Sequence, residues 1–431
     1  MKKILIISYN FAPRQSVGSI RPTKLAQYLA AAGHEVDVVT AKPYGDLDHS
    51  MDNALELVHR MDCIDFRIVE EKPAAKNQTV SEPQKNAAAK KTGALRKLKK
   101  ELYECKKIKR STDFAREFVK LVKSDLERFR SYDAVISSYG PVASHLCGLE
   151  FKKLCPGVMW IADFRDPMVL NISTRISGIY RRRIQKKVCK KADRLVAVSH
   201  GYYERIFDEE DKKKASVVYN GFDRADIDTS AVEPDGEFSF TYVGIMYDGK
   251  RDFSPLLRLL TELIDEGEVS AADVKIKYAG TTFGVLKAQA ERTGFKGQLV
   301  DLGKLPRTDC LKLQASSRHL LLSTWNEKGE YGVFPGKFLE YIMIGRPIVS
   351  FVSGDEPGSE VTAVMKRARL GVTYENATAE EDIPALREYL IRDYKAFKEG
   401  RDAEFSPDAA EVARFDFANT AKSFEEIIDV K

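Results

Sequence analysis

The sequence has few cysteines and no long apolar run. Its six cysteines, spread over 431 residues, form no CxxC pair, which excludes a disulfide-stapled scaffold and a cysteine-rich zinc site. The opening MKKILIISYNF holds an apolar run that is too short for the core of a signal peptide. No later run approaches the roughly eighteen apolar residues of a membrane-spanning helix. We therefore expect a cytoplasmic protein that at most lies peripherally on the inner face of the cell membrane.

Signatures of metal, dinucleotide and hydrolase chemistry are also missing. No HExxH or HxxxH spacing occurs, and the DxD at 226–228 falls in a polar loop rather than at a strand end. The loop at 10–21, after the first strand, is neither GxGxxG nor a P-loop. Nothing resembles a Ser/His/Asp nucleophile elbow. The sequence therefore predicts a protein with no cofactor and no metal.

Apolar strands alternate with helical patterns through most of the chain. The first half contains the strand-like segments KILIIS, EVDVVT, DAVISS, VMWIADF and RLVAVS. The second half repeats the alternation with FSFTYVG, KIKYAG, QLVDLG and HLLLST. This pattern is typical of α/β proteins with a doubly wound parallel sheet. Since 431 residues exceed one comfortable core, we expect two Rossmann-like domains that face each other across a cleft.

The expected boundaries follow from this alternation. Residues 1–213 form the N-terminal domain, 214–405 the C-terminal domain, and 406–431 a terminal helical segment. The polar, proline-containing stretch 70–90 lacks periodicity and is predicted to be a loop of the first domain. Ligands in open α/β sheets bind at the carboxyl ends of the strands, so that edge is where functional residues are sought.

Positive charge is concentrated in one segment. The net charge is +5, but residues 85–130 hold sixteen Lys or Arg against six acids, which is +10 and leaves −5 for the rest. Leu95, Leu98 and Leu102, and later Phe114, recur at helical spacing and predict basic amphipathic helices. Such a segment suits nucleic acid, an anionic membrane or an acidic substrate. A solvated helical face would show the same composition.

A phosphate-binding pattern lies at 330–347. The turn Pro335-Gly336-Lys337 leads into a helix that carries Glu340. Gly336 lets the backbone approach a ligand, the free N–H groups of a helix start attract an anion, and Lys337 adds a positive charge. Glu340 lies on the same helix face, where its carboxylate can accept hydrogen bonds from ribose hydroxyls. The stretch suits a nucleoside diphosphate, although an ordinary strand–turn–helix connection would have the same letters.

Two other strand-to-helix loops carry glycines and cations. Gly244, at the end of a second-half strand, is followed by Lys250 and Arg251, which is the expected place for a second phosphate clamp. In the first half, Gly18 allows close approach of a substrate and Arg21 can pair an anion. A plain loop with a surface arginine is the alternative for this second pair.

Acid–base candidates follow two strands of the first half. Asp163, Arg165 and Asp166 stand where the strand VMWIADF ends, a position suited to a cleft. A salt bridge between the two domains is the alternative. His145 lies at the first turn of the helix after DAVISS and is a candidate cleft histidine, with a purely structural role as its alternative.

Taken together, these segments resemble the family 4 glycosyltransferases of the GT-B fold. The likeness covers nearly the whole chain and depends on the order and spacing of several pieces, among them KILIISYNFAP, SSYGPVASHL, WIADFRDP, ADRLVAVSHG, VVYNGFD, YVGIMYDGKRD and GVFPGKFLEYIMIGRPIVS. The resemblance implies an acceptor-binding first domain, a nucleotide-sugar-binding second domain, and a C-terminal helix that packs back on the first.

The resemblance also implies a role for each candidate residue. The donor-binding residues are Gly18, Gly244, Lys250, Arg251, Gly336, Lys337 and Glu340; Arg21 and Arg165 lie on the acceptor side; and His145, Asp166 and Lys337 are catalytic. In these roles the cations hold the diphosphate, Glu340 holds the ribose, and His145 and Asp166 face the reacting sugar. The departing diphosphate needs fixed cations more than a strong nucleophile.

Two positions depart from the family pattern. The family commonly carries two glutamates separated by seven residues, and Gly332 stands where the first is expected. Glu330, Glu327 or the backbone at 334–336 are the candidates to replace it, unless the sugar is recognised differently. The usual Gly-Arg pair after the first strand of the donor domain is Gly244-Ile245 here.

The expected function is hexosyl-type transfer from a nucleotide-sugar to a saccharide or polyprenyl-diphosphate-linked acceptor, in cell-surface polysaccharide biosynthesis. The resemblance implies retention of the anomeric configuration without a metal, and no nucleic acid partner. Two alternatives remain open. One is a nucleotide-sugar 2-epimerase of the same fold, and the other is a catalytically degenerate subunit that binds sugar nucleotides.

Overall fold

The computed structural model describes most of the chain. The described residues are 1–14, 16–43, 47–49, 52–64, 89–169, 174–226, 232–247 and 249–430. Residues 70–88 of the predicted loop lie outside the described residues, and so does Lys85 of the basic segment. Positions 227 and 228 of the DxD also lie outside them.

The chain divides into two compact units. Unit 1 comprises Met1–Val198, Tyr203–Val218 and Thr420–Lys431, and unit 2 comprises Ser199–Tyr202 and Tyr219–Asn419. Each unit contains one parallel sheet flanked by helices, so the predicted pair of doubly wound α/β domains is confirmed. The division falls at 218/219 and 419/420, whereas the sequence placed it at 213/214 and 405/406.

Unit 1 is built on a seven-stranded sheet with the order β3-β2-β1-β4-β5-β6-β7. Its strands are β1 (Lys3–Ile7), β2 (Glu35–Ala41), β3 (Val58–Ile64), β4 (Ala134–Ser138), β5 (Met159–Phe164), β6 (Arg194–Ala197) and β7 (Ala215–Val217). The central strands are fully buried because helices cover both faces. Leu25 and Leu29 of one helix and Phe424 and Ile428 of another pack onto this sheet and close the core.

The helices of unit 1 include one that is unusually long. They are α1 (Val17–Ala31), α2 (Ala89–Ser124), α3 (Leu126–Arg130), α4 (Ala143–Leu154), α5 (Arg175–Lys191), α6 (His200–Ile206), α7 (Glu209–Lys212) and α15 (Phe417–Asp429), with the short 3-10 turn η1 (Asn53–Leu55). The first residues of α6 and of α15 belong to unit 2. The sequence predicted several basic amphipathic helices, and the structure joins them into the single 36-residue α2.

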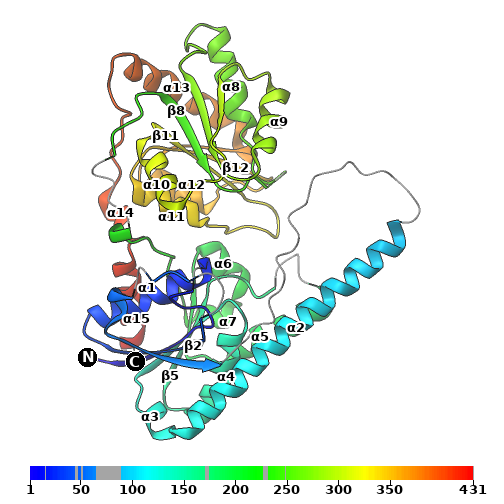
Figure 1. Cartoon of the computed structure of the whole chain (residues 1–431), viewed down its shortest axis with the longest axis vertical. Helices are drawn as coiled ribbons and strands as arrows, with labels where there is room; N and C mark the ends of the chain where they lie inside the picture. Colours follow the sequence, from blue (N-terminus) through cyan, green and yellow to red (C-terminus); the bar gives the residue numbers. More distant parts are fainter. Residues whose placement is uncertain are drawn as a thin grey trace. The chain divides into compact units, whose positions relative to one another are not determined.

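The two halves of α2 differ in their surroundings. Phe114, Phe118 and Val122 in the second half are fully buried, and Phe118 contacts the rings of Phe129 and Phe151. The first half carries exposed side chains on most of its surface and, in Figure 1, extends beyond the other elements of unit 1 as a cyan rod. The amphipathic pattern thus anchors one half of the helix and leaves the other half in solvent.

Unit 2 is built on a six-stranded sheet with the order β10-β9-β8-β11-β12-β13. Its strands are β8 (Phe238–Val243), β9 (Val274–Ala279), β10 (Gln298–Asp301), β11 (His319–Trp325), β12 (Ile348–Ser353) and β13 (Gly371–Glu375). Its helices are α8 (Ser254–Asp265), α9 (Phe283–Thr293), α10 (Arg307–Ser316), α11 (Gly336–Ile344), α12 (Glu360–Arg367), α13 (Ala379–Lys398) and α14 (Ala409–Ala413), with 3-10 turns η2 (Arg224–Asp226) and η3 (Asn376–Thr378).

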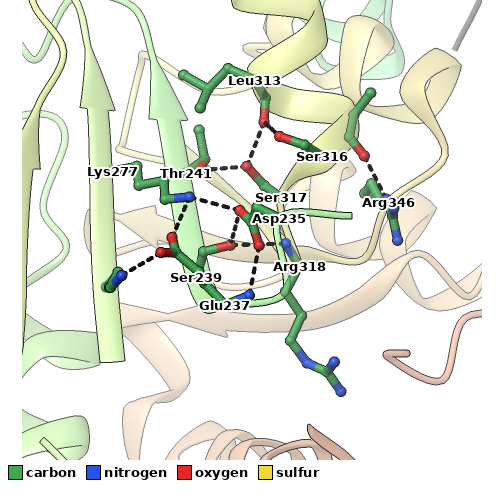
Figure 2. Close-up of polar contacts among 12 residues, drawn as sticks. Asp235, Glu237, Ser239, Thr241, Lys277, Leu313, Ser316, Ser317, Arg318 and Arg346 are labelled. Carbon is green, nitrogen blue, oxygen red and sulfur yellow. Dashed lines mark hydrogen bonds and ion pairs between the residues drawn. The ribbon is translucent and has the colours of Figure 1, made fainter. Parts of the chain in front are cut away.

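A polar network joins the strands of unit 2 near their amino-terminal ends, as Figure 2 shows. Lys277 pairs with Asp235 at 2.8 Å, and Asp235 accepts a hydrogen bond from the Ser239 hydroxyl. That hydroxyl accepts from the backbone N–H of Arg318 at 3.1 Å, which links β8 to β11. Buried polar groups are stable here because each finds a partner. The network fixes the sheet edge opposite to the one that carries the candidate site.

Candidate functional site

The candidate donor-side residues gather at the carboxyl edge of the sheet of unit 2. The neighbouring parallel strands β8 and β11 both end at this edge. The loop after β8 carries Lys250 and Arg251, and the loop after β11 leads into α11 with Lys337 and Glu340. The predicted placement of these segments on one edge follows directly from the parallel topology.

The start of α11 is open. Pro335 occupies the N-cap position, and no side chain caps the first turn. A Cβ added to Gly336 would meet no atom within 4 Å, so the backbone here is accessible. An uncapped first turn with its positive dipole end attracts an anion. The geometry expected of a phosphate-binding turn is therefore present.

Glu340 is held by side chains from two helices. Its carboxylate pairs with Lys337 one turn earlier on α11. It also accepts a hydrogen bond from Gln314 Nε2 of α10 at 2.8 Å and lies 3.5 Å from Arg307 Nη1. With 11% of its side chain exposed, Glu340 is fixed in place by these donors. The sequence predicted that Lys337 and Glu340 share a helix face, and their ion pair agrees with that; no motif signalled Gln314 or Arg307.

Lys250 is held between two carboxylates. Its ammonium group pairs with Glu327 and lies 3.3 Å from Glu330, both in the loop after β11. Hydrogen bonding to Glu327 raises the pKa of Lys250, with a smaller contribution from Glu330. The ammonium also lies 5.6 Å from the ring centre of Trp325. Lys250 thus ties the loop after β8 to the loop after β11.

Arg251 points to a different place from Lys250. It donates to the Tyr242 hydroxyl and, at 2.5 Å, to the carbonyl of Ile245, and it stacks over Tyr247 with 4.6 Å to the ring centre. Burial raises the pKa of Tyr242 to about 12, against the opposing charge of Arg251. The guanidinium therefore lies beside the backbone that follows Gly244, whose φ is +140°. Ile245 replaces the arginine expected after Gly244, but Arg251 places a guanidinium against the backbone of Ile245.

Close packing explains why position 332 is a glycine. Gly332 has φ +76°, and a Cβ there would lie 2.4 Å from the Cα of Gly201, which also belongs to unit 2. A Cβ on Gly201 would in turn lie 2.1 Å from the Cα of Gly332. The Ser199 hydroxyl donates to the Gly332 carbonyl at 2.9 Å and holds the two segments together. No side chain fits at this position, so the missing glutamate is excluded sterically.

Glu360 holds the same segment in place, and no sequence motif pointed to it. Its carboxylate accepts hydrogen bonds from the backbone N–H groups of His200 at 2.8 Å and Gly201 at 3.0 Å. It also accepts from the Tyr219 hydroxyl at 2.6 Å. A carboxylate at a helix start is stabilised by the free N–H groups there. Glu360 therefore fixes the partner of Gly332 from the start of α12.

In unit 1, Arg165 joins the first turn of α1 to the loop that follows β4. It donates to the carbonyls of Tyr139 at 2.6 Å, Gly140 at 3.3 Å and Gly18 at 2.5 Å. The Gly18 carbonyl is available because residue 22, one turn later in α1, is a proline without an N–H. Burial lowers the pKa of Arg165, while Asp163 opposes that shift. Arg165 and the Gly18 carbonyl are thus in direct contact, which the sequence did not predict.

Arg21 lies in the interior of unit 1. Its guanidinium forms two hydrogen bonds with Asp163, at 3.0 and 2.9 Å, and a third with the Val218 carbonyl at 3.0 Å. The Arg21 side chain is 3% exposed, and Asp163 is fully buried. This corrects two expectations. Arg21 is not available at the surface to pair an acceptor anion, and Asp163 forms its salt bridge within unit 1.

His145 is fully buried beside β4. One ring nitrogen, Nδ1, lies 2.8 Å from the Ser137 hydroxyl, which also accepts from Trp160 Nε1 at 2.8 Å. Its Nε2 is buried without a hydrogen-bond partner among the described residues. Burial lowers the pKa of His145 to about 3, so the ring is neutral at physiological pH. His145 can therefore offer a hydrogen bond but does not carry a charge.

Asp166 follows β5 and lies at the surface, where the surrounding protein partly shields its carboxylate from water. Partial burial raises its pKa, and the positive charge of Arg165 opposes this rise. A carboxylate in such surroundings takes up a proton more readily than an ordinary surface aspartate.

Among the described residues no group of His, Cys, Asp or Glu side chains is arranged to hold a metal ion. None of the described helices is long and apolar enough to cross a membrane.

The first half of the chain matches a known sequence family. Residues 22–226 match the model of Glycosyltransferase Family 4. No curated protein matches the chain in sequence. The match covers α1 from Pro22 onward, together with His145 and Arg165, and over these residues it agrees with the resemblance that the sequence motifs indicated; it ends before Lys250, Lys337 and Glu340.

Solved structures share the fold of the whole chain. S. aureus TarM, solved as a mutant with fondaparinux, alpha-GlcNAc-glycerol and UDP, is 9% identical, with a TM-score of 0.54 and coverage of 100% of both chains. WaaG, a glycosyltransferase involved in lipopolysaccharide biosynthesis, is 12% identical, with a TM-score of 0.50 and coverage of 99% of this chain and 100% of WaaG. UDP-GlcNAc 2-epimerase from Methanocaldococcus jannaschii is 11% identical, with a TM-score of 0.48 and full coverage of both. The similarity to TarM and WaaG confirms the GT-B fold, and identities this low show the fold alone.

Proposed function

We propose that this GT-B chain, which matches glycosyltransferase family 4 over residues 22–226, transfers a sugar from a nucleotide-sugar donor to a saccharide acceptor. The observation that carries the proposal is the pair of Lys337 and Glu340 at the uncapped start of α11. A cation and free N–H groups suit a diphosphate, and a fixed carboxylate one turn away suits a ribose. In the described part of unit 2, the sequence predicted a cation, free N–H groups and a nearby carboxylate together only at this helix start.

In the proposed donor site, each phosphate-binding lysine must exchange partners. Lys337 is paired with Glu340, and Lys250 is held by Glu327 and Glu330. A bound diphosphate offers these ammonium groups oxygens of higher charge than a carboxylate. The released carboxylates then become available to accept hydrogen bonds from hydroxyls, Glu340 from the ribose and the other two from the donor sugar.

Glu327 and Glu330 are accordingly our candidates for the family carboxylate that Gly332 cannot supply. Both belong to the loop between β11 and α11, and their backbones are joined by a hydrogen bond of 2.8 Å from Glu330 N to Glu327 O. This turn holds the two carboxylates around a single cation. Their pairing with Lys250 supports a role close to the diphosphate, where the donor sugar is attached.

The proposed chemistry depends on fixed charge. Cleavage of the anomeric bond develops negative charge on the leaving diphosphate, which Lys250, Lys337 and the start of α11 can stabilise without a metal. Positive charge develops on the sugar at the same time. The carboxylate of Asp166 is the unit 1 group proposed to contact the reacting sugar. His145 is fully buried, so its predicted contact with the sugar would require a rearrangement that exposes the ring. Retention of the anomeric configuration is proposed from the family resemblance.

The proposed acceptor is a saccharide, free or carried on a polyprenyl diphosphate, in cell-surface polysaccharide biosynthesis. WaaG, which shares the fold, is described as acting in lipopolysaccharide biosynthesis, and this supports the class of pathway without identifying the acceptor. We place the reaction in the cytoplasm, at the inner face of the membrane. The basic segment in α2 supports this location, because anionic lipids attract clustered Lys and Arg.

The test is a turnover assay. The purified protein is incubated with UDP-, GDP-, ADP- and CMP-sugars, with and without a lipid-linked oligosaccharide fraction, and products are identified by mass spectrometry. We expect nucleotide release and sugar addition only when donor and acceptor are both present, with equal rates in EDTA. An epimerised donor formed without acceptor would instead establish the 2-epimerase. Nucleotide-sugar binding with no product in any mixture would establish a degenerate subunit.

A further inference from the structure

The first half of α2 and the neighbouring helix α5 form an exposed surface with an uneven charge. We call it the α2–α5 surface and define it by residues 96–110 and 175–191. Figure 1 shows α2 passing alongside α5 before it extends away from unit 1, and the two helices pack together. Exposed cations occupy both helices; they are Arg96, Lys97, Lys99, Lys100, Lys106, Lys107, Lys109, Arg175, Arg182, Arg183, Lys186, Lys187, Lys190 and Lys191.

The acidic residues of this surface are used between the two helices. Residues 96–110 contain two acids, Glu101 and Glu104, and residues 175–191 contain none. Glu101 accepts a hydrogen bond from the backbone N–H of Ser177 at 3.2 Å, and Glu104 pairs with Arg181 at 2.7 Å. Both carboxylates are therefore turned toward α5. Glu104 also pairs with Lys107 of α2 at 3.3 Å, so the two acids offset only part of the positive charge of the two segments.

Large apolar side chains are exposed among these cations. Leu98 is 56% exposed and Leu102 55%, while on α5 Ile176 is 59% and Ile179 49% exposed. A scattered exposed leucine needs no explanation, but four on two adjoining helices form a group. Apolar residues bordered by Lys and Arg are the pattern of a helix that lies in a membrane interface.

Helical geometry places the apolar residues of both helices on one side. The contacts Glu101–Ser177 and Glu104–Arg181 advance together along both segments, so the helices run in the same direction. At about 100° per residue, Leu98 and Leu102 lie about 60–100° on from Glu101, while Ile176 lies about 100° back from Ser177. When two parallel helices face each other, a positive rotation from the contact face around one axis and a negative rotation around the other lead to the same side of the pair.

The same calculation adds cations to that side. Lys109 and Lys106 lie about 80° and 140° on from Glu101, and Arg183 and Lys187 lie about 80–120° back from Ser177. Ile179 falls at the outer edge, about 160° back. All of these residues are exposed. One flank of the helix pair thus combines apolar side chains with Lys and Arg.

We propose that the α2–α5 surface docks unit 1 onto an anionic lipid bilayer, with Leu98, Leu102, Ile176 and Ile179 inserted among the headgroups. Lys109, Arg183 and Lys187 would contact the anionic headgroups around them. The proposal specifies the membrane partner named with the proposed function, but it depends on the helix pair alone. A nucleic acid backbone would satisfy the cations and leave the apolar group in water, so a bilayer is the better match.

The experiment measures binding of the full chain to vesicles by co-sedimentation. Vesicles of phosphatidylglycerol and phosphatidylcholine are compared with phosphatidylcholine alone, at low and high salt. One variant carries Leu98→Ser, Leu102→Ser, Ile176→Ser and Ile179→Ser; a second carries Lys106→Gln, Lys109→Gln, Arg183→Gln and Lys187→Gln. We expect binding only to anionic vesicles, weakened by salt, and reduced at least tenfold in each variant.

One control changes the same number of charges elsewhere, and a second, smaller control changes two exposed apolar groups elsewhere. Lys312→Gln, Lys366→Gln, Lys395→Gln and Lys422→Gln remove four exposed cations, and Leu57→Ser with Ile383→Ser removes exposed apolar groups. These controls should keep wild-type vesicle binding. Absence of anionic vesicle binding in the wild type, or loss in the charge variant with full binding in the apolar variant, would overturn the proposal. The second outcome would indicate a soluble polyanion instead.

A nucleotide-binding measurement separates this proposal from the proposed function. Thermal stabilisation by nucleotide-sugars should be the same in wild type and in both surface variants, because every substituted side chain is exposed and lies outside the donor site. If nucleotide-sugars do not bind while anionic vesicles do, the glycosyltransferase proposal fails and the docking surface stands. If nucleotide-sugars bind and vesicles do not, the reverse holds.

Discussion

Replacement of Gly332 by alanine should destabilise unit 2 far more than the same change at another glycine of similar backbone conformation. Gly332 and Gly329 have φ of +76° and +80°, so both replacements carry the cost of a side chain at positive φ. That cost is about 1–2 kcal/mol, partly offset by about 0.4–1 kcal/mol from the stiffer unfolded chain. A Cβ at Gly329 meets nothing within 4 Å, whereas at Gly332 it meets the Gly201 backbone at 2.4 Å.

Backbone atoms cannot rotate away as a flexible side chain can, so the overlap at Gly332 adds the cost of overpacking, about 1–3 kcal/mol. We expect Gly329→Ala to lower the free energy of unfolding by about 1 kcal/mol and Gly332→Ala by about 2–4 kcal/mol. For a unit of this size each kcal/mol shifts the melting temperature by roughly 2–4 °C. Gly201→Ala, at a position without positive φ, should show the overlap by itself.

The assay is thermal and urea unfolding of the three alanine variants, followed by circular dichroism. Gly332→Glu should be at least as unstable as Gly332→Ala and should not gain transferase activity, because the family carboxylate has no room here. The reasoning is refuted if Gly332→Ala is no less stable than Gly329→Ala. A stable and more active Gly332→Glu would refute it as well.

Three further predictions concern other groups of the two units. Glu327→Gln with Glu330→Gln frees Lys250 from partly exposed ion pairs and should therefore tighten binding of the preferred nucleoside diphosphate about two- to fivefold. The additional affinity that the donor sugar contributes should fall. Calorimetry that finds both affinities unchanged would count against the proposed exchange of partners. His145 should contribute a pH dependence to stability, because its pKa of about 3 in the folded protein lies below its ordinary value of 6.5. The unfolded chain therefore binds more protons below pH 6.5, and unfolding curves should show the stability falling by about 2 kcal/mol from pH 7 to pH 5. His145→Gln should lack this component, and an identical pH dependence in that variant would show that the ring is not buried in its neutral form. Arg165→Leu leaves the carbonyls of Gly18 and Tyr139 without their donor, while the Gly140 carbonyl keeps Asn10 Nδ2 at 3.0 Å. The substitution should lower the stability of unit 1 by about 2–4 kcal/mol in urea unfolding, whereas unchanged stability would mean that water replaces the guanidinium at no cost.

The sequence predicted the elements that depend on local pattern. Buried parallel strands such as β1 and β5 are short apolar runs between helical segments, and their order determines which loops share an edge. The contact of Lys337 with Glu340 follows from their spacing on one helix. These features require no knowledge of distant residues.

What the sequence could not predict depends on contacts between distant segments. Gly201 and Gly332 lie 131 positions apart, and nothing in either segment shows that their backbones touch. Arg21 is part of a loop motif that suits an anion, yet its actual partner is Asp163, 142 positions away. Gln314 is an ordinary helical residue until α10 is placed beside α11. Tertiary packing decides each of these roles.

Titration calorimetry of nucleotide-sugars against the wild type and two variants tests the central claim most directly. Lys337→Ala removes the proposed phosphate cation and Glu340→Ala the proposed ribose carboxylate, with Lys312→Ala, exposed on α10, as the matched control. We predict that one nucleotide class binds the wild type and the control alike, and that each site variant weakens it at least tenfold, as expected for loss of a charged hydrogen bond of about 1.5–3 kcal/mol. Equal affinity in all four proteins, or no binding of any nucleotide-sugar, would contradict the account.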